Sequence, residues 1–188
     1  MTTSAKIIEK PNLSIKTQTL ATIAAIVGAV AVPQIFHALG AVSGLGTALG
    51  ETFLPMHLPI ILVGLLAGPF AGAISGLLGP LMSFALSGMP GIVMLPVMMI
   101  ELCAYGLFAG LLRNSKIPTI GKVLIVQISG RVARAAAILL AVYVFGNGSI
   151  KLASIWLSIG TGIFGLALQW TLLPLLIYRV ENMKKHEN

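Results

Sequence analysis

Charged residues are scarce in this chain of 188 residues. Asp, Glu, Lys and Arg together make up 9% of the sequence, against about 25% in typical soluble domains. Hydrophobic residues make up 57%, and the mean hydropathy is +0.99. So few charges cannot cover a water-exposed surface, and no polar stretch is long enough to form a soluble catalytic or nucleic-acid-binding domain. We therefore expect an all-α integral membrane protein.

Cysteine is nearly absent, and common catalytic motifs are missing. The one cysteine, Cys103, lies in an apolar run, which excludes a disulfide framework and a cysteine-based metal cluster. The sequence contains no His-Glu-x-x-His, no Gly-x-Ser-x-Gly and no phosphate-binding loop. We expect neither an enzyme nor a protein with a resident metal or cofactor. An ATP-driven step would need another subunit.

The apolar residues fall into segments long enough to cross a bilayer, for which a helix needs roughly 20 mostly apolar residues. Six spanning helices are predicted, at about residues 19–38, 55–68, 70–88, 92–112, 121–145 and 153–178, of which the second is short and expected to be tilted. The net charge of +7 would favour a nucleic-acid partner in a soluble protein. In a bilayer the position of each charge matters more than the sum, so no such partner is expected.

The distribution of loop charges distinguishes six crossings from five. With the N-terminus in the cytoplasm, six crossings place nine cations inside and only Lys151 outside. Fusing segments 55–68 and 70–88 into one helix would place six cations outside and four inside, and Gly68-Pro69 between them is a turn signal. The positive-inside rule therefore favours a compact bundle of six transmembrane helices with both termini cytoplasmic. The nine cations are Lys6, Lys10, Lys16, Arg113, Lys116, Lys122, Arg179, Lys184 and Lys185.

The whole chain, residues 1–188, is expected to form a single six-helix membrane domain with short cytoplasmic tails at 1–18 and 179–188. Residues 40–54 are predicted to form an external loop of the length that lids and binding loops have. The first segment has an alternative interpretation as a signal peptide cleaved after Ala38-Leu39-Gly40. Its apolar stretch, 20–36, is longer than the usual stretch of about 7 to 15 residues, which favours an uncleaved helix.

Small residues recur at every fourth position in several predicted helices, which lets another helix approach closely. The first segment carries Ala21, Ala25 and Ala29 at this spacing. For this alanine stripe, docking of a partner protein and packing within the bundle both remain open. For the glycines with the same spacing we expect packing within the bundle. These are Gly64, Gly68, Gly72 and Gly76, and then Gly106 and Gly110.

Ionisable residues inside the predicted helices are the stronger functional signal, because burying each one costs at least about 2.5 kcal/mol. Glu101, Arg131 and Arg134 are such residues, and Gln127 shares a helix face with the two arginines. A structural pair between Glu101 and Arg131 and a cluster that contacts ligand both remain open. One carboxylate cannot neutralise two guanidinium groups, so the surplus charge would suit an anionic or acceptor-rich ligand.

Two further candidates lie near the predicted outer mouth of the second segment. His57 is near the start of that segment, and Glu51 precedes it in the predicted external loop. The alternative for His57 is a structural histidine held by a hydrogen bond. The candidate solute-binding residues are therefore Glu51, His57, Glu101, Gln127, Arg131 and Arg134.

Taken together, these features resemble the substrate-binding S component of an energy-coupling-factor (ECF) vitamin transporter, of the riboflavin and pantothenate carrier type. The resemblance covers nearly the whole chain and rests on size, six spans, cytoplasmic termini, the alanine stripe and the long first external loop. Two sequence runs reinforce it. They are Leu54-Pro55-Met56-His57-Leu58-Pro59, continuing through Gly64, Gly68-Pro69, Gly72, Gly76 and Gly79-Pro80, and Glu101-Leu102-Cys103-Ala104-Tyr105-Gly106.

The resemblance implies a high-affinity binding subunit for a small water-soluble vitamin or vitamin precursor, located in a cell membrane of bacterial type. Such a subunit would dock through Ala21, Ala25 and Ala29 onto a transmembrane coupling subunit that works with two ATPase subunits. Its binding site would lie near the outer surface, under the first external loop. Two other classes remain open: a structural or assembly subunit stapled by Glu101 and Arg131, and a small self-sufficient carrier that dimerises through its glycine faces.

Overall fold

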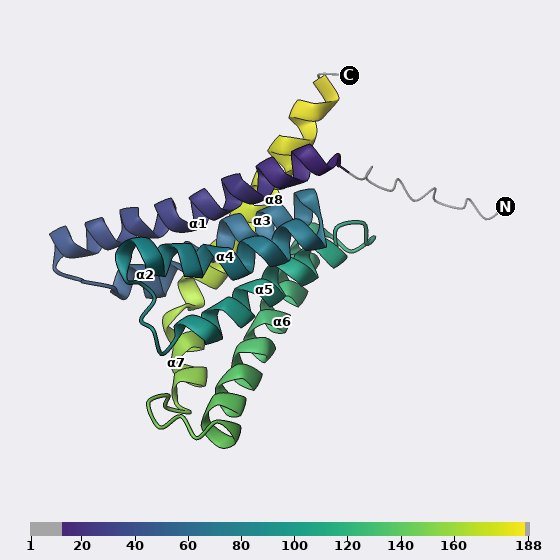
Figure 1. Ribbon diagram of the computed structural model, residues 1–188. Coiled ribbons are helices and arrows are strands. Elements are labelled where there is room, and N and C mark those ends of the chain that lie inside the picture. Colours follow the sequence, from purple (N-terminus) through teal and green to yellow (C-terminus); the bar gives the residue numbers. More distant parts are fainter. Residues whose placement is uncertain (1–12, 187–188) are drawn as a thin grey trace.

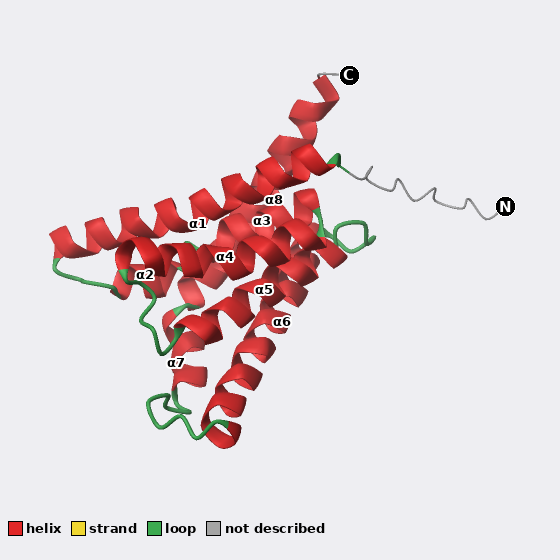
Figure 2. Cartoon of the chain, viewed as in Figure 1, coloured by secondary structure: helices red, strands yellow, loops and turns green. Residues whose placement is uncertain are grey.

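The computed structural model describes residues 13–186, and this part of the chain consists of helices and connecting turns without strands (Figures 1 and 2). Lys6 and Lys10 lie outside the described residues, as do the side chains of Lys184 and Lys185. The α-helices are α1 (Ile15–Ser43), α2 (Ala48–Phe53), α3 (His57–Ala67), α4 (Pro69–Ser87), α5 (Leu95–Leu111), α6 (Thr119–Leu139), α7 (Ser154–Thr161) and α8 (Ile163–His186). One π-helical turn, η1 (Leu140–Val144), continues α6.

Five helical segments of the described chain are long and apolar enough to cross a membrane. They are Ile15–Ser43, Ala48–Ala67, Pro69–Ser87, Thr119–Val144 and Ile163–Val180. The remaining candidate, α5, is apolar and has 17 residues, which is at the lower end of the range of about 17 to 25 for a spanning helix. The fold is therefore all-helical, with a composition and helix lengths that suit a membrane protein.

Local chemistry explains where the helices begin and end. The Ser14 hydroxyl caps α1 by accepting a hydrogen bond from the Thr17 backbone N–H at 3.2 Å. Gly68 ends α3 with a φ of 107°, a conformation that favours glycine, and Pro69 occupies the first turn of α4. The predicted break at Gly68-Pro69 is confirmed.

Two predicted segments differ from the structure. Residues 40–54 do not form one continuous loop, because α1 extends to Ser43 and residues 48–53 form the short helix α2. The predicted helix at 153–178 is interrupted at Gly162, which separates α7 from α8. Both departures lie at the same end of the bundle, where α7 contacts α2.

Helix α5 is at the centre of the bundle, in contact with α3, α4 and α6. Its close approach to α4 depends on glycine, because a Cβ placed on either Gly72 or Gly106 would overlap the backbone of the other. Gly64, Gly76 and Gly110 likewise leave no room for a side chain against neighbouring helices. The expectation of packing within the chain is confirmed for these five glycines, whereas a Cβ on Gly68 would meet no atom within 4 Å.

The alanine stripe of α1 also faces the interior. Ala25 is 6% exposed and packs with residues of α3 and α4, and Ala29 is completely buried in the central core. Ala21 is half-buried beside Ala25. Of the two interpretations that the sequence left open, the structure therefore assigns Ala25 and Ala29 to packing within the chain. The docking role of the stripe stays a prediction.

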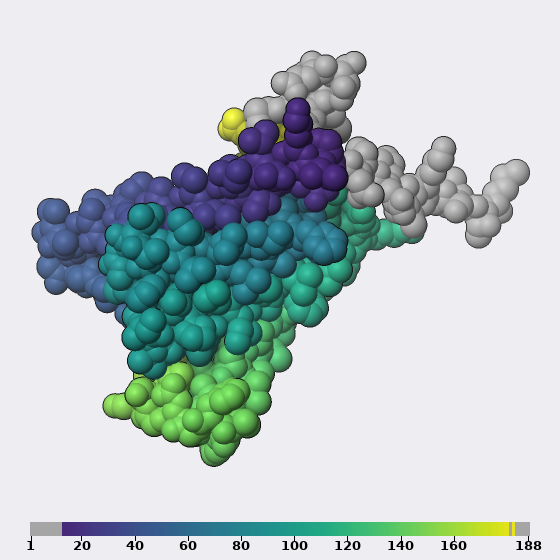
Figure 3. Space-filling view, viewed as in Figure 1, coloured from purple at the N-terminus to yellow at the C-terminus, as the bar shows by residue number. Residues whose placement is uncertain are grey.

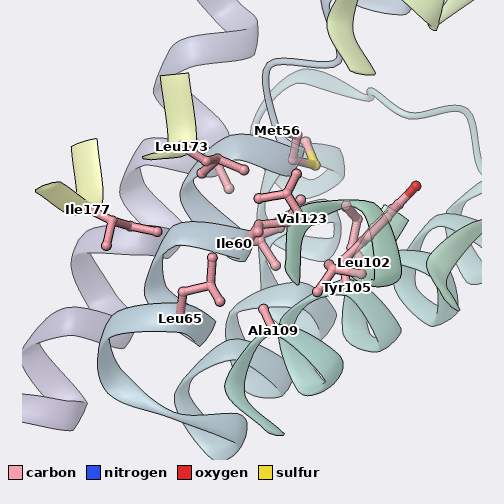
Figure 4. Packing of buried hydrophobic residues seen from close by; sticks show 12 residues of the cluster. Met56, Ile60, Leu65, Leu102, Tyr105, Ala109, Val123, Leu173 and Ile177 are labelled. Atoms are coloured by element: carbon pink, nitrogen blue, oxygen red, sulfur yellow. The ribbon is translucent and has the colours of Figure 1, made fainter. Parts of the chain in front are cut away.

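The largest buried apolar cluster joins α1, α3, α5, α6 and α8, as Figure 4 illustrates. Ile60, Ile61 and Leu102 are completely buried in it. Tyr105 belongs to the same cluster, and its ring lies among these apolar side chains while its hydroxyl points away from them (Figure 4). A buried tyrosine hydroxyl needs a polar partner, and the partner here is Glu101.

The beginning of α1 and the end of α8 lie on one side of the molecule (Figure 1). The turn between η1 and α7 protrudes at a different end, shown in light green in Figure 3. Among cations with described side chains, Lys16, Arg113 and Arg179 lie near the end where α1 begins, whereas Lys151 precedes α7. We call the end formed by α2, α7 and the C-terminal part of α1 the cavity end.

Candidate functional site

A cavity of about 470 Å³ opens at the cavity end of the bundle. Six helices contribute to its wall: α1, α2, α4, α5, α6 and α7, together with the first residue of α3. Its volume is within the range of about 300 to 1,000 Å³ typical of small-molecule sites. Much of the wall is apolar, and three charged residues of the wall, Glu101, Arg131 and Arg134, meet where α5 faces α6.

The Glu101 carboxylate is the centre of these polar groups and is only 1% exposed. Arg131 Nη1 donates a hydrogen bond to Glu101 Oε1 at 3.1 Å, and Arg134 Nη1 donates to Glu101 Oε2 at 2.7 Å. Each arginine thus binds a different oxygen of the same carboxylate. The predicted contact between Glu101 and Arg131 is present, and Arg134 joins it.

The positions of these groups follow from helix geometry. Arg131 and Arg134 are three residues apart on α6 and therefore lie on one face, turned toward α5. One turn further along α5 from Glu101, Tyr105 donates its hydroxyl to Glu101 Oε1 at 3.4 Å. Gly130 leaves room for this ring, because a Cβ there would lie 2.5 Å from a Tyr105 ring carbon.

His57, at the start of α3, completes the cluster. Its Nε2 lies 3.8 Å from Glu101 Oε1, and its ring contacts the Tyr105 ring edge-on with centroids 5.0 Å apart. The side chain of His57 is 5% exposed, and the residue lines the cavity. Its Nδ1 has no hydrogen-bond partner among the described residues.

The cluster carries more positive than negative charge. Two guanidinium groups share one carboxylate, so one positive charge has no counter-charge within this group. Both arginine side chains are 12% exposed and both line the cavity. Arg131 Nε and Nη2 and Arg134 Nε have no hydrogen-bond partner in residues 13–186. Leaving a buried donor without a partner costs about 1 to 3 kcal/mol, and more for a charged group.

Glu51 lies at the mouth of the cavity rather than in this cluster. It is an exposed residue in the first turn of α2, and its Oε1 accepts a hydrogen bond from the Thr47 hydroxyl at 3.2 Å. Five of the six predicted solute-binding residues therefore line one cavity: Glu51, His57, Glu101, Arg131 and Arg134.

Gln127 does not line the cavity, and its proposed contact with solute is not supported by its position. Its Nε2 donates to Gln169 Oε1 and to the Leu166 carbonyl, both at 3.1 Å, and Trp170 Nε1 donates to Gln127 Oε1 at 2.7 Å. These bonds connect α6 to α8. The residue shares a helix face with Arg131, but it lies one turn deeper in the bundle and serves packing there.

Several cavity residues were not predicted from the sequence. Ser154, Ser158 and Thr161 line the cavity from α7, and the Ser158 hydroxyl accepts a hydrogen bond from Arg131 Nη1 at 3.4 Å. Their spacing of four and three residues places them on one face of a short helix, a pattern that the sequence did contain. His37, a weaker histidine candidate in the sequence, also lines the wall, as does Met98, which the sequence places on the helix face of Glu101. The methionines supply adaptable apolar surface.

Comparisons of this chain with protein-family models, with curated proteins and with solved structures found no match.

Proposed function

We propose that this chain is the substrate-binding subunit of an ATP-driven importer of the ECF type, which takes up a small water-soluble vitamin or vitamin precursor. The observation that carries the proposal is the cavity whose wall contains two arginines and a single carboxylate. A buried charge without a counter-charge lowers the stability of the fold, so its presence indicates a functional role. A solute that enters the cavity and brings negative charge would remove that cost.

The proposal includes six crossings with both termini in the cytoplasm. In that topology α2 and α3 together form the second crossing, α5 forms the fourth, and the cavity opens to the outside. Its support is the charge distribution: Arg113 and Lys116 lie in the turn between α5 and α6, whereas Lys151 lies in the turn before α7. The positive-inside rule assigns the more cationic side to the cytoplasm.

A labelling experiment tests this topology. In a Cys103→Ala background, the exposed residues Asn114 and Ser149 are replaced singly by cysteine. We expect a membrane-impermeant maleimide to label Ser149→Cys on intact cells, and Asn114→Cys only after the cells are opened. Labelling of both positions on intact cells, or the reverse pattern, would contradict the proposed orientation.

The partners that would energise transport in this proposal are a transmembrane coupling subunit and two ATPase subunits. Because Ala25 and Ala29 are buried, the coupling subunit would contact the outward face of α1 instead. Ile23 and Val27 are 52% and 59% exposed on that face. Branched aliphatic side chains of this kind can contact either lipid or a helix of the coupling subunit, and a purification experiment distinguishes the two.

The test is purification of the tagged chain from its native membranes in a mild detergent, followed by identification of the bound proteins. We expect the coupling subunit and the ATPases to co-purify with the wild-type chain and to be lost from Val27→Trp. The matched control is Ile128→Trp, which changes a residue on α6 that is 64% exposed and should retain the partners. Recovery of the chain alone, or in a membrane complex without ATPases, would contradict the proposal and favour an assembly role.

A further inference from the structure

The charge and lining of the cavity restrict the solute more narrowly than the proposed function does. We infer that the site binds an organic monoanion, with one carboxylate at the end lined by Arg131 and Arg134 and an apolar body along the rest of the wall. This inference rests on the proposed function as a solute-binding subunit. It concerns which chemical class of solute the site accepts.

The number of charges favours a monoanion. Glu101 is the only carboxylate within hydrogen-bond distance of the two arginines in the described chain, so the cluster has one positive charge in excess. A solute with one negative charge would make the buried group neutral. A neutral solute would leave the excess, and a dianion would replace it with an excess of the opposite sign. Both alternatives retain an uncompensated charge at a site shielded from water.

With His57 as a neutral imidazole, the remaining titratable neighbours leave this count unchanged. His57 contacts Glu101 from α3, and Tyr105 donates its hydroxyl to the same carboxylate. Glu51 is at the solvent-exposed mouth, where water screens its charge, and it bonds to Thr47 rather than to an arginine. His37 lines the wall from α1 near Gly50 of α2.

The arrangement of donors favours a carboxylate. Arg131 Nε and Nη2 are adjacent N–H donors on one guanidinium group, and neither has a hydrogen-bond partner among the described residues. Two such donors match the two oxygens of a carboxylate in a bidentate contact. Gly162 packs closely against this group, because a Cβ there would lie only 3.2 Å from Arg131 Nη2.

The size and lining of the cavity favour an organic molecule over an inorganic ion. A volume of about 470 Å³ is many times the roughly 30 Å³ that one water molecule occupies in the liquid. Met56, Met94, Met98 and Leu157 line it with apolar surface. A halide or phosphate ion would leave this surface in contact with water, whereas an apolar body attached to the carboxylate would cover it.

Two pairs of small probes test the inference: benzoate with benzamide, and hexanoate with hexanamide. Each amide matches its acid closely in shape and has no charge at pH 7.5. We expect millimolar benzoate or hexanoate to raise the Tm of the purified full-length chain in detergent. The affinity for each amide should be at least about tenfold lower than for its acid, which is the ratio that one charge-assisted hydrogen bond supplies. Amides as effective as the acids, or no response to either acid, would overturn the inference.

Variants identify the group that provides the selectivity. Arg131→Gln should abolish the preference for acid over amide, and Arg131→Lys should retain part of it because it keeps the charge and loses the paired donors. The control is Lys151→Gln, which removes an exposed cation outside the cavity wall and should retain the full preference. A full acid preference in folded Arg131→Gln would also overturn the inference. Loss of the ATPases in the purification described above would contradict the importer while leaving acid selectivity intact, so the two failures are distinguishable.

Discussion

The unequal charge count around Glu101 predicts that the carboxylate and the arginine of one ion pair differ sharply in their importance for stability. Glu101→Gln leaves two mostly buried guanidinium groups without a counter-charge. Arg131→Gln leaves Glu101 and Arg134 as a one-to-one pair at 2.7 Å. If the carboxylate is shared as described, the first substitution should be far more damaging than the second.

The magnitudes follow from known costs. Removing one partner of a buried pair costs about 3 to 5 kcal/mol. For Arg131→Gln, the lost hydrogen bond is offset by removal of the surplus charge, so we expect about 0 to 2 kcal/mol. In a chain of 150 to 250 residues each kcal/mol corresponds to about 2 to 4 °C in Tm, so Glu101→Gln should lower Tm by about 6 to 20 °C and Arg131→Gln by less than about 8 °C.

The assay is thermal unfolding of the purified chain in detergent, monitored by the loss of the helical circular dichroism signal. Cys103 provides a second reporter, because it is the single cysteine, lies half-buried on α5 and should react with a maleimide dye as the bundle opens. Lys151→Gln is the control for removing a cation and should have the same Tm as the wild-type chain. If Arg131→Gln proves as unstable as Glu101→Gln, the reasoning about a shared carboxylate is wrong.

Three further predictions concern packing. Gly106→Ala should lower the free energy of unfolding by at least about 1 to 3 kcal/mol, because its methyl group would overlap α4. The control Gly160→Ala, with no atom within 4 Å of the new Cβ, should leave thermal stability unchanged or raise it slightly. Equal Tm values for the two variants would contradict this prediction. Gln127→Ala should destabilise the chain by about 1 to 3 kcal/mol while leaving benzoate affinity unchanged, since its bonds connect α6 to α8 outside the cavity; a calorimetric titration that finds weaker binding in the folded variant would return this residue to the site. Ala29→Leu, at a completely buried position, should lower Tm in the same assay, and Val27→Leu, at a position 59% exposed, should not; the opposite order would mean that α1 is rotated.

The parts of the fold that depend on local chemistry could be predicted from the sequence. Gly68-Pro69 ended one helix and began the next because a glycine with positive φ and a proline in a first helical turn act within a few residues. The short helix α2 was missed because its six residues are too few to show a hydrophobic period. The residues around Gly162 form an interrupted helix for which hydropathy alone predicts a continuous one.

The site could be predicted in part, because buried charge is conspicuous in an apolar sequence. Glu101, Arg131 and Arg134 stood out for this reason, and the structure brings them together. Gln127 lies outside the cavity wall although it shares the face of Arg131, because helical spacing fixes the face of a residue but says nothing about where along that face a cavity ends. The alanine stripe was ambiguous for a related reason: small residues permit close approach, whichever helix is the neighbour.

Native mass spectrometry of the chain released gently from its own membranes tests the central claim most directly, because it reports whether the cavity holds a solute. We predict one small organic molecule bound per wild-type chain, retained in Lys151→Gln and lost from folded Arg131→Gln. A wild-type chain that carries no solute, or the same bound mass in wild type and Arg131→Gln, would contradict the claim that these arginines form a solute-binding site.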